Sequence, residues 1–223
     1  MLKGWLKKLY HLSIGLPPRS EEPYATHVPI LVGVAATLKP KRLIEFGAGS
    51  FSTLSFMDDV AFPSLEQVNS YENNKEWFEQ VEERSRGNSR VDLQYFAGDM
   101  YRAVAGADVA AADMIFIDDS PAPTPEERVK TVKEVSKLCG ERPVVLLHDY
   151  DILKLRLGAR NFEHLVVFDA FNPQSCAVWH GHPERRPVLE EVNRTIRKHA
   201  GDVPLTDVRA WIDVFTAKSN GLH

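Results

Sequence analysis

The amino-acid sequence predicts an α/β protein with a mostly parallel, doubly wound sheet and helices on both of its faces. Strand-like and helix-like segments alternate from Ala25 onward, five of the strand-like segments end in an acidic residue, and a Gly-x-Gly stretch follows the first of them. Alternating strands and helices pack as a parallel sheet with crossover helices. The carboxyl ends of parallel strands share one edge, where open α/β folds bind ligands.

The composition fits one globular domain without a basic surface for nucleic acid. The chain has 223 residues, 43% of them hydrophobic, and a formal net charge of -4. We expect a single domain over residues 24–223, preceded by an N-terminal helix and linker over residues 1–23. The longest uncharged apolar run, Val28 to Leu38, is too short to cross a bilayer. The two cysteines have no metal-ligand spacing and favour a cytoplasmic protein.

The first residues form an amphipathic pattern with apolar side chains on one helix face and lysines beside them. Leu2, Trp5, Leu6 and Tyr10 share that face. A packing helix or the contact helix of a homodimer is favoured over an anchor on a membrane surface, because the stretch is short. We therefore expect no stable membrane anchor.

The first half of the domain gives clear element boundaries. A helix reaches Leu38 and is closed by Pro40. Ser52 is expected to cap a helix that extends to Ala61, and Asn73 to cap the next one. Thr124 and Glu127 form a capping box for a helix that ends at Gly140. Strands are expected over residues 42–46, 67–72, 91–99, 113–118 and 143–149.

The second half is less sharply patterned. Two strands over residues 163–171 and 176–181 are expected around a turn at Asn172-Pro173. A helix follows over residues 185–201, and residues 209–217 are interpreted as a last strand. The pairing of these late strands does not follow from the sequence.

The acidic residues at the strand ends are the main functional signal. A single acid after a strand is most often a solvated loop residue or a helix cap. Five acids on one edge are better explained by a ligand that is cationic or rich in hydroxyl groups. These acids are Glu45, Glu72, Asp99, Asp118 and Asp149.

The residues around the glycines indicate which nucleotide this edge binds. Glu72 lies 25 residues after Gly47, close to the offset of about 20 residues at which nucleotide sites place an acid on the ribose. Gly47 and Gly49 let the backbone approach a ligand. Glu45 would repel a pyrophosphate, and Ser52 replaces the third glycine of a dinucleotide loop, which disfavours an NAD-dependent dehydrogenase. Adenosine joined to an amino acid through a sulfonium fits better.

From Ala25 to Val178 the sequence resembles the class I S-adenosylmethionine-dependent methyltransferases, which have a Rossmann-like, seven-stranded sheet. "IEFGAG" is similar to the first motif of that family and "IFIDDSP" to the fourth. Phe51 stands where many members carry a further glycine. The ending Ser52-Thr53 is similar to the small-molecule O-methyltransferases of the catechol and macrocin types.

The resemblance implies S-adenosylmethionine as the cofactor. The Gly47–Gly49 loop would lie beside its amino-acid part, Glu72 would hold the ribose, and Asp99 would accept a hydrogen bond from the adenine amino group. The residues implied at the cofactor site are Glu45, Gly47, Ala48, Gly49, Ser52, Thr53, Glu72, Asn73, Gly98, Asp99, Met100 and Asp118.

Some members of that subgroup also bind a divalent metal. By the resemblance, Asp118 matches the first ligand and Asp149 one of a second pair, and the remaining ligand falls on His148 or on Tyr150. Two carboxylates alone hold Mg²⁺ poorly, and a histidine would favour a transition metal. Metal binding is therefore left open.

Three residues are candidates for catalysis: His148, Asp118 and Asp149. His148 has two interpretations of equal weight, a general base for an acceptor hydroxyl or a histidine that caps the strand or bonds a neighbouring carboxylate. Other conspicuous side chains are expected to be structural. Asp119 and Asp151 are expected to be solvated or capping, His180 and His182 to lie on the surface, and Tyr71, Trp77 and Trp211 to lie in the core.

The function that the sequence predicts is methyl transfer from S-adenosylmethionine to a small molecule, at a hydroxyl oxygen. Aminopropyl transfer is an alternative, because "IDDSP" faintly resembles the D-S-x-D-P pattern of polyamine synthases, although their strand-rich N-terminal domain is not found here. Methylation of amino nitrogens is disfavoured, since the motif [DNS]-P-P-[YF] is absent. A non-catalytic protein that binds the cofactor as a scaffold is a third alternative.

Overall fold

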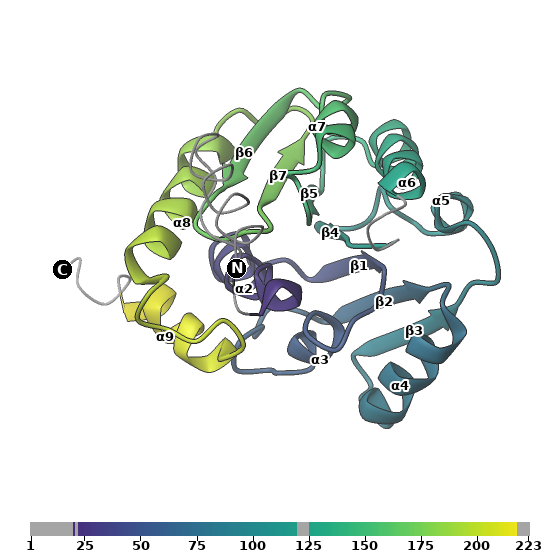
Figure 1. Ribbon diagram of the computed structural model, residues 1–223, viewed down its shortest axis with the longest axis horizontal. Helices are drawn as coiled ribbons and strands as arrows, with labels where there is room; N and C mark the ends of the chain where they lie inside the picture. Colours follow the sequence, from purple (N-terminus) through teal and green to yellow (C-terminus); the bar gives the residue numbers. More distant parts are fainter. Residues whose placement is uncertain (1–19, 21, 120–124, 218–223) are drawn as a thin grey trace, which may run out of the picture.

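The computed structural model describes residues 20, 22–119 and 125–217, and these build a seven-stranded sheet (Figure 1). The strand order is β3-β2-β1-β4-β5-β7-β6. Neighbours from β3 to β5 are parallel, whereas β7 is antiparallel to both β5 and β6. The strands are β1 Arg42–Phe46, β2 Gln67–Glu72, β3 Val91–Tyr95, β4 Met114–Ile117, β5 Val144–Leu147, β6 His164–Phe168 and β7 Ser175–Trp179. The predicted mostly parallel sheet is thus confirmed.

The helices alternate with the strands along the chain. They are η1 Pro23–Ala25, α2 Val28–Leu38, α3 Thr53–Phe56, α4 Lys75–Ser85, α5 Met100–Ala103, α6 Pro125–Leu138, α7 Leu153–Ala159, α8 Arg185–His199 and α9 Val208–Ala217.

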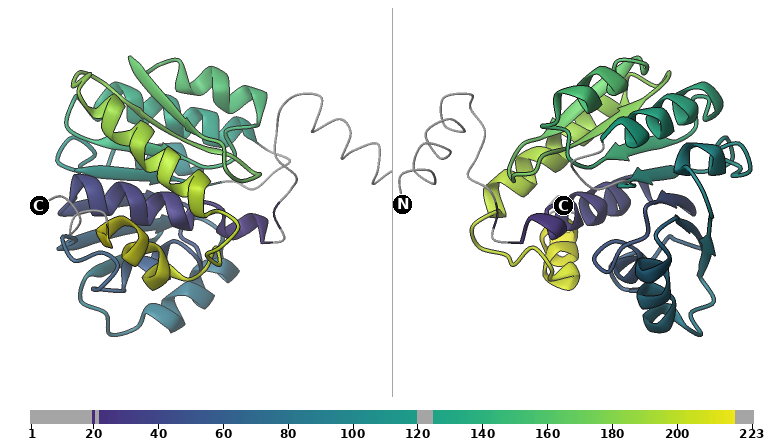
Figure 2. Two further views of the ribbon diagram at one scale, coloured as in Figure 1. Left: turned by 90° about the vertical axis from the view of Figure 1, so that its left-hand side faces the viewer. Right: turned by 45° about the vertical axis from the view of Figure 1, so that its right-hand side comes forward.

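Two hydrophobic clusters lie on the two faces of the sheet, as alternating side chains along each strand require. Leu43 and Phe116 belong to one cluster, and Ile44 and Ile115 to the other. Helices α2, α8 and α9 cover the first face, whereas α5, α6 and α7 cover the second (Figure 2). All residues of β4 and β5 are buried, as expected for central parallel strands.

The sheet reverses its strand order at β1, which lies between β2 and β4. Ligands of open α/β sheets bind at such a switch point, beyond the carboxyl ends of the strands. The ends of β1, β2, β3, β4 and β5 therefore define the candidate site, and they carry the acids that the sequence singled out.

The boundaries of β1 and β2 were predicted to the residue, and β3, β4 and β5 are shorter than expected. The strand expected over residues 209–217 is wrong, because this segment is helix α9. Trp211 and Ile212 are buried there, and the ring of Phe215 packs against Gly33 of α2. Trp211, Ile212 and Phe215 lie at i, i+1 and i+4, which is the spacing of one helix face, and this face packs against α2.

Two predicted caps also differ from the structure. Ser52 occupies the N-cap position of α3 without a capping side-chain hydrogen bond, and α3 ends at Phe56 rather than at Ala61. The cap of α4 is Asn74 instead of Asn73, and its side chain accepts a hydrogen bond from the Trp77 amide. Asn73 is instead turned toward the carbonyl of Gly98, beyond the end of β3.

The N-terminal helix, most of the linker expected before Pro23, and Thr124 of the capping box lie outside the described residues. Within residues 20, 22–119 and 125–217, no helix has the length and apolar character needed to cross a membrane. Cys139 and Cys176 are both buried and form no disulfide. A cytoplasmic location stays a prediction.

Candidate active site at the carboxyl edge of the sheet

The loop after β1 is fixed by backbone contacts to the two neighbouring strands. The amides of Gly47 and Ala48 both donate to the carbonyl of Tyr71, at 2.9 and 3.1 Å. Gly47 has a φ of 93°, and a Cβ atom there would lie 2.4 Å from the amide nitrogen of Asp119. The glycine is therefore required for close packing of the loop against the end of β4. This requirement comes from packing within the protein and not from contact with a ligand.

Glu45 lies beneath this loop rather than at its surface. The side chain is fully buried, and its Oε2 accepts hydrogen bonds of 2.6 Å from the hydroxyls of Thr53 and Ser70. Thr53 in turn accepts a hydrogen bond from the amide of Gly49 at 2.9 Å. Burial raises the pKa of Glu45 to about 7, against the opposing effect of the hydroxyls of Ser52, Ser70 and Thr53. Glu45 thus supports the shape of the glycine loop from below.

Trp77 was expected in the core, and this expectation is wrong. Its side chain is 39% exposed, and its indole Nε1 donates a 2.6 Å hydrogen bond to the carbonyl of Ala48. Helix α4 buries Val81 instead and leaves Trp77, one turn earlier, beside the loop. Trp211 is fully buried and Tyr71 nearly so, as expected.

Glu72 ends β2 next to the glycine loop. It is only 6% exposed, and its Oε1 accepts a 2.6 Å hydrogen bond from the amide of Asn74. Burial raises the pKa of Glu72 to about 7, although the amides of Asn74 and Asn73 oppose the shift. Among the described residues no cationic side chain forms an ion pair with Glu72.

The end of β3 is tied to the end of β2 by one side chain. The side-chain amide of Asn73 donates a 3.0 Å hydrogen bond from Nδ2 to the backbone carbonyl of Gly98. Asp99 is exposed at the N-cap position of α5 and lies 3.7 Å from the Nε of Arg102, and Met100 is buried. The structure thus brings Glu72, Asn73, Gly98 and Asp99 to adjacent strand ends, as the motifs predicted.

The ends of β4 and β5 are organised by a residue that the sequence interpretation missed, Arg128 of α6. Its guanidinium is 2% exposed and binds Asp118 Oδ1 and Asp149 Oδ2, both at 2.9 Å. It also donates to the backbone carbonyls of Asp119 and His148. A weak signal was present, since Arg128 lies on the same helix face as the buried Val132 and Val135.

The carboxylates considered as metal ligands, Asp118 and Asp149, are therefore joined by a guanidinium. The nearby imidazole of His148 and the guanidinium of Arg128 hold the pKa of Asp118 well below its usual range, although burial acts in the opposite direction. Asp119 is buried, in contrast to the solvated or capping role expected for it. Its Oδ2 accepts a 2.7 Å hydrogen bond from Thr131, and burial raises its pKa to about 6.

His148 is held at both ring nitrogens. Nδ1 lies 3.1 Å from Asp118 Oδ1, and Nε2 lies 3.0 Å from the hydroxyl of Thr26. Burial lowers the pKa of His148, but the Asp118 carboxylate and its hydrogen bond outweigh this effect and raise it. The interpretation of a histidine bonded to a neighbouring carboxylate is confirmed, whereas its role as a base stays a prediction.

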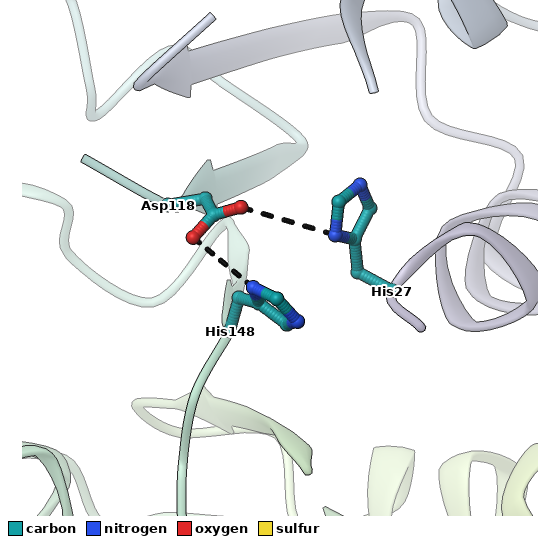
Figure 3. Close-up of side chains that lie close together, drawn as sticks. All are labelled: His27, Asp118 and His148. Atoms are coloured by element: carbon teal, nitrogen blue, oxygen red, sulfur yellow. Dashed lines mark hydrogen bonds and ion pairs between the residues drawn. The ribbon is translucent and has the colours of Figure 1, made fainter. Parts of the chain in front are cut away.

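His27, at the N-cap position of α2, completes the cluster and was not singled out from the sequence (Figure 3). It is 3% exposed, and its Nδ1 lies 3.8 Å from Asp118 Oδ2. Neither ring nitrogen has a hydrogen-bond partner among the described residues. Burial lowers the pKa of His27 to about 3, so the imidazole is neutral at pH 7. No local motif marks this histidine, because its position depends on how α2 packs on the sheet.

The remaining polar candidates lie away from this cluster or cap a turn. Asp151 accepts a 3.2 Å hydrogen bond from the amide of Gln174, in keeping with a capping role. His182 is exposed as expected and bonds Glu184. His180 was expected on the surface but is largely covered, and its ring stacks on Phe162.

No protein-family model and no curated protein sequence matches this chain. Solved structures are similar to it at low sequence identity. A spermidine synthase in complex with the transition state analogue AdoDATO is 19% identical, with a TM-score of 0.55 over 85% of this chain and 76% of that chain. Human methyltransferase-like protein 13 in complex with SAH is 21% identical, with a TM-score of 0.54 over 80% and 93%.

The methyltransferase domain of bacterial CtHen1-C is 12% identical, with a TM-score of 0.51 over 71% of this chain and 98% of that chain. At these identities the similarity concerns the fold. The chain thus has the fold of class I S-adenosylmethionine-dependent methyltransferases, as its motifs predicted.

Proposed function

We propose that the protein transfers a methyl group from S-adenosylmethionine to a hydroxyl oxygen of a small molecule. The observation that carries the proposal is Glu72, a buried carboxylate at the end of β2, beside the glycine loop and without a cationic partner among the described residues. A carboxylate in this position accepts hydrogen bonds from both ribose hydroxyls. The fold supports the same conclusion, although folds host unrelated activities.

The charges at the edge favour a cofactor without phosphate groups. Phosphate sites use basic side chains or a helix N-terminus. Here the buried cation Arg128 is already engaged by Asp118 and Asp149, and Glu45 lies beneath the loop that would face a pyrophosphate. When bound, S-adenosylmethionine supplies an electrophilic methyl group on a positively charged sulfur. Glu72 would bind its ribose, Gly98, Asp99 and Met100 would border the adenine, and the Gly47–Gly49 loop would lie along the amino acid.

Methyl transfer requires an aligned acceptor and a place for its proton. The protein contributes mainly by holding the two reactants in line. His148 is the proposed base, and for that role its Nε2 exchanges the hydroxyl of Thr26 for the hydroxyl of the acceptor. Asp118, at 3.1 Å from Nδ1, then stabilises the imidazolium that forms. We expect His148→Ala to lower turnover with little change in cofactor affinity, and unchanged turnover would remove His148 from the mechanism.

Aminopropyl transfer is the second candidate, because the similar structures include a spermidine synthase. Its acceptor is an amine, which is cationic at neutral pH and needs carboxylates that are not already neutralised. Arg128 binds both Asp118 and Asp149, and Asp119 is buried and accepts a hydrogen bond from Thr131. The acceptor side of the edge is therefore better suited to a neutral, hydroxylated molecule such as a sugar or a polyketide. The formal net charge of -4 also disfavours nucleic acid as the acceptor.

The test is a calorimetric titration of S-adenosylmethionine and S-adenosylhomocysteine into the wild type and Glu72→Gln, with EDTA and then with Mg²⁺ or Mn²⁺. Loss of a charged acceptor for two hydroxyls should weaken both ligands roughly 10- to 100-fold. Glu66→Gln is the matched control, since Glu66 is exposed and pairs with Lys41 near the amino end of β1.

Absence of binding to the wild type under every condition would contradict the proposal. Binding of decarboxylated S-adenosylmethionine in preference to the intact cofactor would favour aminopropyl transfer. Tight binding without methyl consumption across panels of hydroxylated acceptors would favour a scaffold role.

A further inference from the structure

We propose that His27, Asp118 and His148 form a binding site for one transition-metal dication, with Zn²⁺ as the matching probe (Figure 3). The site differs from the Asp118–Asp149 pair, because it uses two imidazoles and a helix that the sequence motifs do not include. Arg128 and His148 both bind Asp118 Oδ1, whereas Asp118 Oδ2 faces His27.

The first argument is the state of His27. Its side chain is 3% exposed, and both ring nitrogens lack a hydrogen-bond partner among the described residues. A buried polar group without a partner is costly and rare in folded proteins. The Nδ1 atom of His27 is directed at the carboxylate of Asp118, at 3.8 Å from Oδ2. A metal ion bound to Nδ1 would supply the missing partner.

The second argument is geometry. One ligand atom from each of the three residues lies within 4.8 Å of the other two. The distance from His27 Nδ1 to Asp118 Oδ2 is 3.8 Å, and that from His148 Nδ1 to Asp118 Oδ1 is 3.1 Å. A tetrahedral zinc site with bonds of about 2.0–2.1 Å places its ligand atoms roughly 3.3 Å apart. Small side-chain rotations close the set. The ion binds the Nδ1 lone pair of a neutral His148 ring whose proton lies on Nε2, toward the hydroxyl of Thr26, and an imidazolium ring releases its Nδ1 proton to solvent as the metal binds.

The third argument is charge and ligand type. Asp118, Asp119 and Asp149 surround the single guanidinium of Arg128, so the cluster has more carboxylates than cations. Two imidazoles and one carboxylate suit Zn²⁺, Fe²⁺ or Co²⁺, whereas Mg²⁺ and Ca²⁺ prefer oxygen ligands. The hydroxyl of Thr26 holds His148 Nε2 at 3.0 Å, the kind of outer contact that fixes the ring of a metal-bound histidine.

Metal binding at this site does not depend on the proposed methyl transfer. With the ion on Nδ1, the ring proton of His148 stays on Nε2, so in the metal-bound form the ion and not His148 would activate an acceptor hydroxyl. With three protein ligands, a tetrahedral ion keeps one position open. Use of that position to polarise an acceptor hydroxyl rests on the proposed function, so the test measures the metal alone, without cofactor or acceptor.

The experiment is a titration of EDTA-treated, dialysed protein with Zn²⁺ by calorimetry and with Co²⁺ by its visible absorption. We expect one ion per chain, with an intense tetrahedral cobalt spectrum. His27→Gln and His148→Gln should each weaken binding on the order of 100-fold. His182→Gln is the matched control, because His182 is an exposed histidine that pairs with Glu184 and not with Asp118.

Binding that survives His27→Gln but is lost in His182→Gln would overturn the proposal, as would the absence of stoichiometric binding to the wild type. A measurement on the wild type alone tests the site even if a variant fails to fold. Histidine ring-nitrogen signals in a ¹H–¹⁵N spectrum should shift on Zn²⁺ addition for His27 and His148 and not for His182. Shifts confined to His182 and His180 would contradict the site.

Discussion

The two halves of the carboxyl edge treat their acids in opposite ways. At the ends of β1 and β2, Glu45 and Glu72 are buried and have no cationic partner in the part of the chain that the structure describes, and burial raises the pKa of each to about 7. At the ends of β4 and β5, Asp118 and Asp149 bind one buried guanidinium, and the pKa of Asp118 is lowered. The strand-end acids that look alike in the sequence are therefore two kinds of group.

These different surroundings indicate which strand-end acids can bind a ligand and which ones stabilise the protein. Glu72 has no cationic partner among the described residues and can exchange its present hydrogen bond for those of a neutral diol, whereas Glu45 is fully buried and supports the glycine loop. A carboxylate oxygen held by Arg128 already has its partner and stabilises the site that it borders. We expect the cofactor to contact the first half of the edge and the acceptor to approach the second.

The largest expected effect comes from removing the cation of the second half. Arg128→Met leaves three buried or half-buried carboxylates without their partner, and should lower the free energy of unfolding by about 3–5 kcal/mol. The melting temperature should fall by roughly 10 °C, measured by calorimetry or circular dichroism at pH 7.

Arg142→Met is the control for Arg128→Met. Arg142 also binds an aspartate, Asp113, but its side chain is 56% exposed and lies at the opposite edge of the sheet. An exposed pair of this kind contributes less than about 1 kcal/mol. Equal losses for the two variants would show that Arg128 does not hold the second half together.

The next effect concerns the buried acid of the first half. Because the pKa of Glu45 is raised to about 7 in the folded state, folded protein keeps a proton that unfolded protein releases. Its contribution to stability is present below pH 4.5 and is lost as the pH rises through 7. The sum over this window is about 3 kcal/mol.

Urea unfolding at pH 5, 6, 7 and 8 measures this dependence. Glu45→Gln removes the titration, so the stability of that variant relative to the wild type should rise with pH. Glu66→Gln, at an exposed acid, should follow the wild type. A wild type and a Glu45→Gln variant with parallel pH profiles would mean that Glu45 is not titrating in this window.

A third effect is smaller and concerns binding. Glu72 must be ionised to accept two ribose hydroxyls, and its pKa is about 7 without ligand. Affinity for S-adenosylhomocysteine should therefore rise with pH between 6 and 8, by up to about tenfold per unit below the pKa. In Glu72→Gln the affinity should be weak and nearly independent of pH. A pH slope that persists in this variant would assign the titration to another group.

The sequence predicted the first half of the edge better than the second, for a physical reason. The limits of β1 and β2 follow from short apolar runs that end in an acid, and these signals are local. Arg128 and His27 come from α6 and from the start of α2, and they reach Asp118 only because these helices pack on the sheet. Contacts between residues so far apart along the chain produce no regular spacing that a single sequence could reveal.

Trp77 and α9 also show that a local sequence pattern does not determine which residues are buried. An apolar run or an indole indicates burial, but the neighbouring element decides which face is buried. Helix α4 buries Val81 and places Trp77 beside the glycine loop. Residues 208–217 form a helix whose buried residue Trp211 lies on the side that packs against α2. The local pattern is compatible with more than one answer until the packing partner is known.

The smallest expected effect tests the link between Trp77 and the loop. Trp77→Phe removes the 2.6 Å hydrogen bond from Nε1 to the carbonyl of Ala48 and keeps an aromatic ring beside it. A single neutral hydrogen bond contributes about 0.5–1.5 kcal/mol, so cofactor affinity should fall only a few-fold. Trp211→Phe is the matched substitution, because it removes an indole hydrogen bond of 3.0 Å to Pro204 away from the edge. It should lower the melting temperature more than Trp77→Phe does, since Trp211 is fully buried, and leave cofactor affinity unchanged. If Trp211→Phe weakens the cofactor as much as Trp77→Phe, the loss reflects general stability, and the indole of Trp77 does not hold the binding loop.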